Sequence, residues 1–276
     1  TRWPGISVLR LPGQFLMRRG QVGFTLIELI MVIILLAIVA TISVRFVGLS
    51  TGSAIDTGAR QQRSLAGVVI SEQISRALRT ALPTSVRTNG PCIEWMPTVA
   101  ASNYLNLPQG PTPDSFDAVP LANGASANGR IVVYGYGGNL YSPSNPGPLS
   151  PPATLPAGTG PVTVTFDGGA SHRFTGNSPE RRFYVVDNPI SFCQYGRFLY
   201  RYKNYGIQSS IATGLPTGMP DREVLAATLK ANSVVFKVVP PTLKRAAVVS
   251  VEFVLEDPDS GESTTVHQEV QIRNVP

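Results

Sequence analysis

An uninterrupted apolar stretch near the N-terminus constrains the fold of this chain more than any other feature. Residues 24–44 read FTLIELIMVIILLAIVATISV, and Glu28 is the single charged side chain among them. A helix of this length spans about 31 Å, which is enough to cross the hydrocarbon core of a bilayer. A secretory signal peptide is the alternative. However, this apolar run is too long for the core of a signal peptide, and no A-x-A cleavage site follows it. We therefore predict a transmembrane helix over residues 24–46.

The positive charge of the chain is concentrated beside this stretch. The chain has 23 Lys and Arg and 17 Asp and Glu, a formal net charge of +6. Residues 1–23 contain four Arg and no acid, residues 24–79 contain five Arg and three acids, and residues 80–276 contain 14 of each sign. The positive-inside rule keeps Arg18 and Arg19 in the cytoplasm and places the chain after the helix outside.

Glu28 is the unusual residue of the apolar stretch. A carboxylate within a membrane helix costs about 3 kcal/mol on insertion scales, so it usually has a partner or a function. One interpretation is that Glu28, near the start of the helix, reaches the membrane interface. The other is a positive partner at the same depth, which cleavage after Gly23 would supply as the new α-amino group of Phe24.

The string RRGQVGFTLIELIMVIILLAIVATI resembles the prepilin signature of type IV pilins and type II secretion pseudopilins. That signature combines a short basic leader, Gly before the cleavage site, Phe after it and Glu as the fifth mature residue, which correspond here to Gly23, Phe24 and Glu28. The resemblance implies that a prepilin peptidase and N-methyltransferase cleaves after Gly23 and methylates the amine of Phe24. It also implies that Glu28 pairs with the terminal amine of a neighbouring subunit.

The leader, residues 1–23, departs from the family pattern because family leaders are usually short. A start at Met17 would give MRRGQVG, which has the usual form. We therefore expect residues 1–16 to reflect an upstream start site.

Residues 47–82 predict an amphipathic continuation of the stem helix. Gly48, Gly52 and Gly58 lower helical propensity, so we expect the helix to loosen over 47–58. Apolar residues then recur at spacings of three and four, and charged residues occupy the opposite face. The apolar stripe is Gly67, Ile70, Ile74, Ala77, Leu78, Ala81 and Leu82, and the opposite face carries Arg63, Glu72, Arg76 and Arg79.

Residues 83–276 predict a β-rich head. Nine short runs have the composition of strands: 92–96, 130–136, 162–166, 182–187, 190–194, 197–202, 233–239, 247–255 and 264–272. The turn 256–262 joins the last two into a hairpin, and 221–229 predicts a short helix. Residues 104–129 and 141–161 predict long loops, and the seven prolines of the second are not expected in a strand.

The fold predicted from these patterns, and implied by the prepilin resemblance, is α+β and pilin-like. A long N-terminal helix, membrane-spanning in its first half, packs on an antiparallel β-sheet head with long loops.

Further segments narrow the resemblance. SEQISRALRTALPTSVR, IEWMPTVAASNYL and RRFYVVDNPISFCQYGRFLYRYKNYG resemble the MshO-type minor pilins of MSHA pilus systems and, less closely, the J-type minor pseudopilin of type II secretion. The resemblance implies a minor subunit that assembles or primes a pilus, with other pilins and an inner-membrane assembly platform as partners. It implies a single-pass inner-membrane protein with a periplasmic head that later joins a pilus or pseudopilus. A tip adhesin that uses the two long loops is a further alternative.

Cys92 and Cys193 fall in predicted strands of the exported part. An oxidising compartment and an even number of cysteines favour a disulfide, which would stabilise the fold by up to roughly 4.7 kcal/mol on the chain-entropy model. Two buried free thiols are the alternative.

Basic and aromatic residues alternate within 197–205. This composition suits a strand that binds nucleic acid through stacking and phosphate contacts. Alternation also predicts basic residues on the wet face and aromatics in the core, and the neutral charge of 80–276 favours that second interpretation.

Metal, cofactor and enzyme signals are weak. Asp257, Asp259 and Glu262 could line a calcium loop, but they match the EF-hand pattern poorly and a solvated turn fits them better. His172 and His267 lie in strand-like contexts without further zinc ligands at suitable spacing. The G-x-S-x-G string at 48–52 lacks the preceding strand that a nucleophile elbow needs. We therefore predict no metal, no cofactor and no enzymatic activity.

Overall fold

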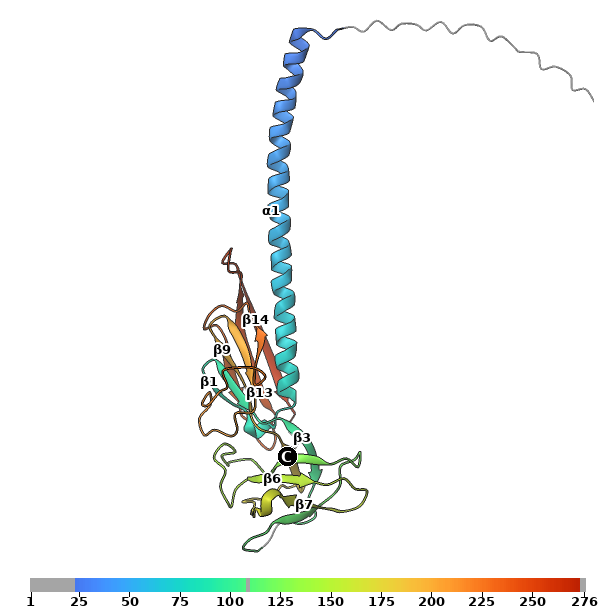
Figure 1. Ribbon diagram of the computed structural model, residues 1–276, viewed down its shortest axis with the longest axis vertical. Helices are drawn as coiled ribbons and strands as arrows, with labels where there is room; N and C mark the ends of the chain where they lie inside the picture. Colours follow the sequence, from blue (N-terminus) through green and yellow to red (C-terminus); the bar gives the residue numbers. More distant parts are fainter. Residues whose placement is uncertain (1–22, 108–109, 274–276) are drawn as a thin grey trace, which may run out of the picture. The chain divides into compact units, whose positions relative to one another are not determined.

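The computed structural model, shown in Figure 1, describes residues 23–107 and 110–273. Within them the helix α1 (Leu26–Arg79) precedes fourteen strands that form three antiparallel sheets. The predicted α+β fold, a long N-terminal helix packed on antiparallel sheets, is confirmed. Arg18, Arg19 and the rest of the leader before Gly23 lie outside the described residues. The chain divides into two units, 1–59 and 60–276, and each is described by itself.

Helix α1 continues through the glycines at which we expected it to loosen. Gly48, Gly52 and Gly58 all lie within its hydrogen-bonded span, and a Cβ added at any of them would meet nothing within 4 Å. A glycine costs a helix about 1 kcal/mol, but it keeps its backbone hydrogen bonds. Three isolated glycines therefore do not end this helix.

The last turns of α1 pack on two of the sheets through the predicted apolar stripe. Ile70, Ile74 and Leu78 are buried and belong to one core with Trp95 and Phe192. Gly67 lies so close to the sheet that a Cβ there would approach Val266 Cγ2 to 2.9 Å.

The five-stranded and three-stranded sheets provide the other side of this core. The five-stranded sheet contains, in order, β1 (Arg87–Asn89), β2 (Cys92–Trp95), β9 (Ile190–Tyr195), β10 (Phe198–Tyr202) and β11 (Arg222–Ala226). The three-stranded sheet contains β12 (Val235–Val239), β13 (Ala247–Glu256) and β14 (Ser263–Ile272). The predicted hairpin is confirmed, because β13 and β14 pair directly from Glu256 and Ser263 onward.

The third sheet is built from the segment between β2 and β9, two strands that pair with each other. Its order is β3 (Thr98–Asn103), β8 (Arg182–Val186), β5 (Ala127–Val132), β6 (Leu149–Leu155), β7 (Val162–Phe166) and β4 (Ser115–Ala118). Short 3₁₀ helices occupy Pro83–Ser85 and Asp167–Gly169. In Figure 1 the labelled β3, β6 and β7 form a group separate from β9, β13 and β14, and this sheet has its own core around Phe116, Ile131 and Phe183.

The predicted helix at 221–229 is wrong, because Arg222–Ala226 forms strand β11. This segment pairs antiparallel with β10, with Arg222 opposite Tyr202 at one end and Ala226 opposite Leu199 at the other. Ala226 and Leu229 are buried in the core shared with α1. The hydrogen bonds and burial offered by β10 outweigh the weak helical propensity of DREVLAATL.

The prediction that 141–161 contains no strand is also wrong. β6 lies inside the six-stranded sheet and contains Pro151 and Pro152. The pairing of β5 with β6 has a bulge here, and the Ile131 N–H donates to Ser150 Oγ at 2.9 Å instead of a backbone carbonyl. On the other side β6 pairs with β7 only at Ala153 and Thr154. The prolines therefore occupy positions where the ladder needs no N–H.

The remaining predicted strands overlap observed ones, although 130–136 ends as a strand at Val132. The 104–129 segment, predicted as a loop, contains β4 and the start of β5. Each predicted loop therefore contributes seven residues to a sheet, and these residues are not free contact surface.

Candidate functional site

The start of α1 holds the residues of the prepilin-like motif. Gly23 and Phe24 precede the helix and are exposed. Thr25 caps it, since its Oγ1 accepts the Glu28 N–H at 3.3 Å and its carbonyl accepts the Leu29 N–H at 3.1 Å. The sequence analysis missed this role of Thr25, although T-x-x-E before an apolar run is the signature of a capping box.

Glu28 lies in the first turn of α1 and is exposed. Unpaired N–H groups make this end of a helix electropositive, so a carboxylate is favourable there. Across 23–107 and 110–273, no side chain bonds to the Glu28 carboxylate. It is therefore open to a cationic partner from outside these residues.

The first part of α1 exposes apolar side chains on every face. The most apolar part of this helix is long enough to span a bilayer, and none of it is buried. By length and composition this helix is able to cross a membrane. Within the unit 1–59, the described residues provide no other element to cover these side chains.

The peptide bond between Gly23 and Phe24 lies outside the helix, so its carbonyl and N–H are not committed to the helical ladder. Hydrolysis of this bond would leave an α-amino group on Phe24. That amine would lie about one helical turn before Glu28 in the chain.

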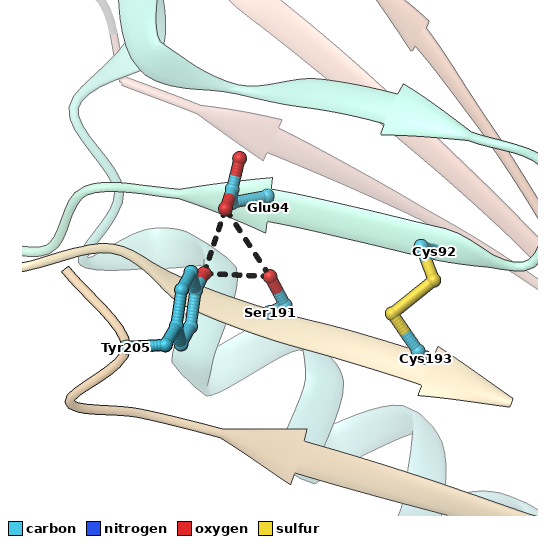
Figure 2. Close-up of a disulfide and its surroundings, with 5 residues drawn as sticks. All are labelled: Cys92, Glu94, Ser191, Cys193 and Tyr205. Carbon is cyan, nitrogen blue, oxygen red and sulfur yellow. Dashed lines mark hydrogen bonds between the residues drawn. A yellow bond between two sulfur atoms is a disulfide. The ribbon is translucent and has the colours of Figure 1, made fainter. Parts of the chain in front are cut away.

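The head contains a second polar cluster, drawn in Figure 2 beside the disulfide that joins Cys92 to Cys193. Cys92 pairs with Cys193 across β2 and β9, and Glu94 pairs with Ser191 two residues along. Residues two apart on a strand share a face, so these four side chains lie on one side of the sheet. Ile93 and Phe192 point the other way, into the core under α1.

Glu94 is 0% exposed, and its charge is fully paired. Arg87 forms an ion pair with it, and the Tyr205 hydroxyl donates to Glu94 Oε1 at 2.8 Å. The Ser191 hydroxyl lies 2.6 Å from Tyr205 Oη, and because the Tyr205 proton is directed at Glu94, serine is the donor of this bond. Burial, and then the Glu94 charge, raise the pKa of Tyr205, so this phenol stays a neutral donor.

Arg87 extends the cluster to a loop. Its guanidinium donates to the carbonyls of Gln208 and Ser209, both at 2.7 Å, and lies 3.5 Å from the centre of the Tyr141 ring. The arrangement fastens the chain after β10 onto β1 and β2, which is a structural task. The sequence analysis missed Glu94, and the available signal was a carboxylate between the apolar residues of the predicted strand 92–96.

Two of the three calcium candidates at the β13–β14 turn, Asp257 and Glu262, contact arginines of α1. Arg63 pairs with Asp257 at 3.0 Å and also with Glu262, and Arg60 pairs with Glu262 at 2.6 Å. The Arg63 side chain is only 10% exposed and contacts the β13–β14 turn, so its predicted place on the face opposite the apolar stripe is wrong.

The surroundings of these carboxylates favour their charged forms. The N–H groups of Ser260 and Asp259, then Arg63, lower the pKa of Asp257, and Arg60 followed by Arg63 lowers that of Glu262. Asp259 donates its own N–H to Asp257 Oδ1 at 2.9 Å. In the described ranges, no group of three or more His, Cys, Asp or Glu is placed to hold a metal ion.

The basic residues of 197–205 are committed to contacts within the head. Lys203 donates to Glu223 at 2.7 Å, Arg201 lies 3.6 Å from the same carboxylate, and Arg197 donates to the Glu256 carbonyl at 2.8 Å. The alternation predicted aromatic side chains in the core, and this is confirmed for Tyr202, which is buried, whereas Phe198 is exposed. Leu199 faces the core under α1, and Tyr200 and Tyr202 pack around the disulfide on the other face.

The histidines lie apart. His172 lies in a loop and not in a strand, is buried, and donates from Nε2 to the Gly147 carbonyl at 3.0 Å. His267 lies on β14 and is exposed, 3.7 Å from Glu252. The G-x-S-x-G string at 48–52 lies within α1, so Ser50 is not on a strand-to-helix turn.

Comparison with known proteins identifies one match. Residues 18–44 match the family model described as the prokaryotic N-terminal methylation motif. No curated protein matches the chain, and no solved structure does. The motif supports a type IV pilin-like or pseudopilin-like structural subunit that is membrane-anchored, processed by a prepilin peptidase and assembled with other pilins. The match ends at Val44, before the head begins.

Proposed function

We propose that this chain is a minor pilin-like subunit that assembles or primes an MSHA-type type IV pilus. The observation that carries the proposal is the methylation motif at residues 18–44 together with the exposed Gly23–Phe24 bond at the start of α1. A prepilin peptidase cleaves this bond, and the amine of Phe24 is methylated. Before assembly α1 anchors the chain in the inner membrane, with the head in the periplasm.

Glu28 has a defined task in this proposal. Its carboxylate, near the electropositive start of α1, pairs with the Phe24 amine of the neighbouring subunit. An unpaired carboxylate in an apolar assembly is costly, so this contact selects the register in which the charge is neutralised. The apolar faces of α1 provide the remaining contact with neighbouring helices.

The head favours a minor over a repeating role. It carries a complete inserted six-stranded sheet between β2 and β9, which makes it bulky for a subunit that must repeat along a shaft. A J-type minor pseudopilin of a secretion system would also be a minor subunit with a bulky head. The subunits that co-purify with this chain would therefore distinguish a pilus from a secretion system.

The test is Glu28→Ala in the native host. We expect processing at Gly23 to continue, which mass spectrometry reports as a mature chain that begins with methylated Phe24. Incorporation of the chain into filaments is expected to be lost, measured by immunoblot of sheared filaments and by filament counts.

Asp56→Ala is the matched control, because Asp56 is another exposed acid on α1. It is expected to leave incorporation unchanged. Normal incorporation of Glu28→Ala would refute the assembly role, and a mature chain that does not begin at Phe24 would refute the processing step.

A further inference from the structure

Strand β14 leaves one long side of the three-stranded sheet open. It pairs with β13 over ten residues without a register shift, and β13 pairs with β12 on its other side. Edge strands are usually protected by a bulge, a proline, an inward charge or a short length. β14 reads STTVHQEVQI and has neither bulge nor Pro, Gly or Lys.

The hydrogen bonds around β13 show which groups of β14 point outward. The Val254 carbonyl accepts from Lys230 N at 2.7 Å, and Val254 N donates to Ser233 Oγ at 3.2 Å, both away from β14. Thr265 lies directly opposite Val254. Directly opposite residues of an antiparallel pair either exchange both backbone bonds or neither, so the N–H and C=O of Thr265 also point away from β13. The same holds at every second residue, for His267, Glu269 and Gln271. Within the described part of the chain, the one bond made to these outward groups is from the Gln268 side chain to the Glu269 carbonyl, at 3.0 Å.

A groove runs beside this open edge. It encloses about 510 Å³ between Thr264–Gln268 of β14 and one flank of α1. The helix side is formed largely by small residues, Ser64, Gly67, Ser71 and Ser75, with Val68 beside them. The groove is therefore wide enough for backbone to approach β14.

Ser71 supplies an independent sign that the groove is incomplete. It lines the groove and is 8% exposed, and its Oγ has no hydrogen-bond partner in the described residues. A buried hydroxyl without a partner is unfavourable, so an occupant that bonds to it gains that contact. Val68, 67% exposed on the same flank, would also be covered.

We infer that β14 and this flank of α1 accept an extended strand from a neighbouring pilin-like subunit. This inference rests on the function proposed above. Added about 4.8 Å from β14, such a strand pairs with the outward groups of Thr265, His267, Glu269 and Gln271. Its inward side chains lie over Val68 and Ser71. The groove contains both Glu72 and Arg79, so it has no dominant charge, and recognition is by backbone and small apolar side chains.

Residue-resolved hydrogen exchange tests this inference on the full chain, alone in detergent micelles and within filaments purified from the host. In micelles the four outward amides are expected to exchange rapidly, whereas those of Thr264, Val266, Gln268 and Val270 are protected by β13. In the assembly the outward amides are expected to slow by at least about tenfold. Unchanged exchange in a chain that is incorporated would overturn the inference alone, and absence from every assembly would overturn the proposed function as well.

Thr265→Pro provides a second test, because it removes one outward N–H and leaves the ladder to β13 intact. Co-purification of neighbouring subunits is expected to fall by about tenfold or more, a change of about 1.4 kcal/mol in association. Thr265→Ala keeps the N–H and is the matched control. Equal co-purification of the two variants would contradict strand addition, and the wild-type exchange data decide the question if Thr265→Pro fails to fold.

Discussion

Glu28 and Glu94 are both carboxylates next to apolar residues, but their surroundings give them different tasks. Glu94 is buried and paired with Arg87 and Tyr205, so its bonds are internal to the head. Glu28 is exposed, and its carboxylate bonds to no side chain of the described residues. The first stabilises the fold, and the second is available for a contact with another chain.

Replacing Glu94 by Ala is expected to destabilise the head by about 3–5 kcal/mol, because Arg87 would keep a partly buried charge without its partner. The measurement is the free energy of unfolding of the full chain in detergent, from urea denaturation. Glu72→Ala is the control, since Glu72 forms an exposed pair with Arg76 and its loss should cost about 0.5 kcal/mol or less. Similar losses in both variants would contradict a structural role for the Glu94 cluster.

His172 is expected to make the stability of the head depend on pH. Burial lowers its pKa in the folded state, so the folded protein keeps the ring neutral while the unfolded chain binds a proton below about pH 6.5. Stability should therefore fall as the pH decreases through about 6.5. The slope of unfolding free energy against pH between about 7.5 and 5.5 measures this effect.

His172→Gln is expected to flatten that slope. An equal slope in wild type and His172→Gln would assign the pH dependence to other groups. The ion-paired Asp257 and Glu262 act at lower pH, because their lowered pKa values give stability that is present above the unfolded carboxyl pKa and lost in acid.

At the scale of elements, pairing partners outweigh local propensity. DREVLAATL has helical composition, yet it becomes β11 because β10 offers hydrogen bonds and the core accepts Ala226 and Leu229. The proline-rich β6 forms a strand because a bulge and a short pairing with β7 remove the need for two N–H groups. Neither condition can be read from the segment itself.

The contact of α1 with β14 depends on Gly67. Gly67→Val is expected to destabilise the head by about 1–3 kcal/mol, because a side chain there meets Val266 and Leu255. In a Val266→Ala background the loss should be smaller, since the nearer methyl group is removed. Unfolding free energies of the four proteins in this double-mutant cycle give the coupling, and strictly additive losses would contradict the close packing.

The whole molecule combines a neutral head with an apolar, positively flanked anchor. Positive charge is concentrated beside the segment predicted to cross the membrane, where the positive-inside rule leads us to expect it to set orientation. Among the described residues, the two largest hydrophobic cores of the head lie under α1 and within the inserted six-stranded sheet.

The disulfide closes the base of that insertion, because β2 and β9 flank it and Cys92 and Cys193 are 101 residues apart. Replacing both cysteines by Ser is expected to lower the unfolding free energy by about 2–5 kcal/mol through the larger entropy of the unfolded chain. Urea denaturation measures the loss, and the intact mass after alkylation reports the redox state. Two alkylated thiols in unreduced wild type would contradict the bridge, and unchanged stability of the variant would contradict its structural role.

Much of the head could be predicted from sequence, since each of the nine expected strands overlaps an observed one. The turn between β13 and β14 and the stripe on α1 were also predicted, because periods of two and 3.6 are local signals. Sheet order, the insertion and the Glu94 cluster could not be predicted. Arg87, Glu94 and Tyr205 meet only because β1 and β2 pair with each other and the chain after β10 folds back on them.

The sequence by itself determined the apolar helix, the methylation motif at residues 18–44, and the position of Glu28 within it. These depend on residues that are neighbours in the chain, so a pattern of about 25 residues contains the information. Tertiary structure alone decided that 222–226 is a strand, that Arg63 turns toward the β13–β14 turn, and that β14 is an open edge beside a groove. Those outcomes depend on backbone and side-chain partners that are distant in sequence, and folding brings them together.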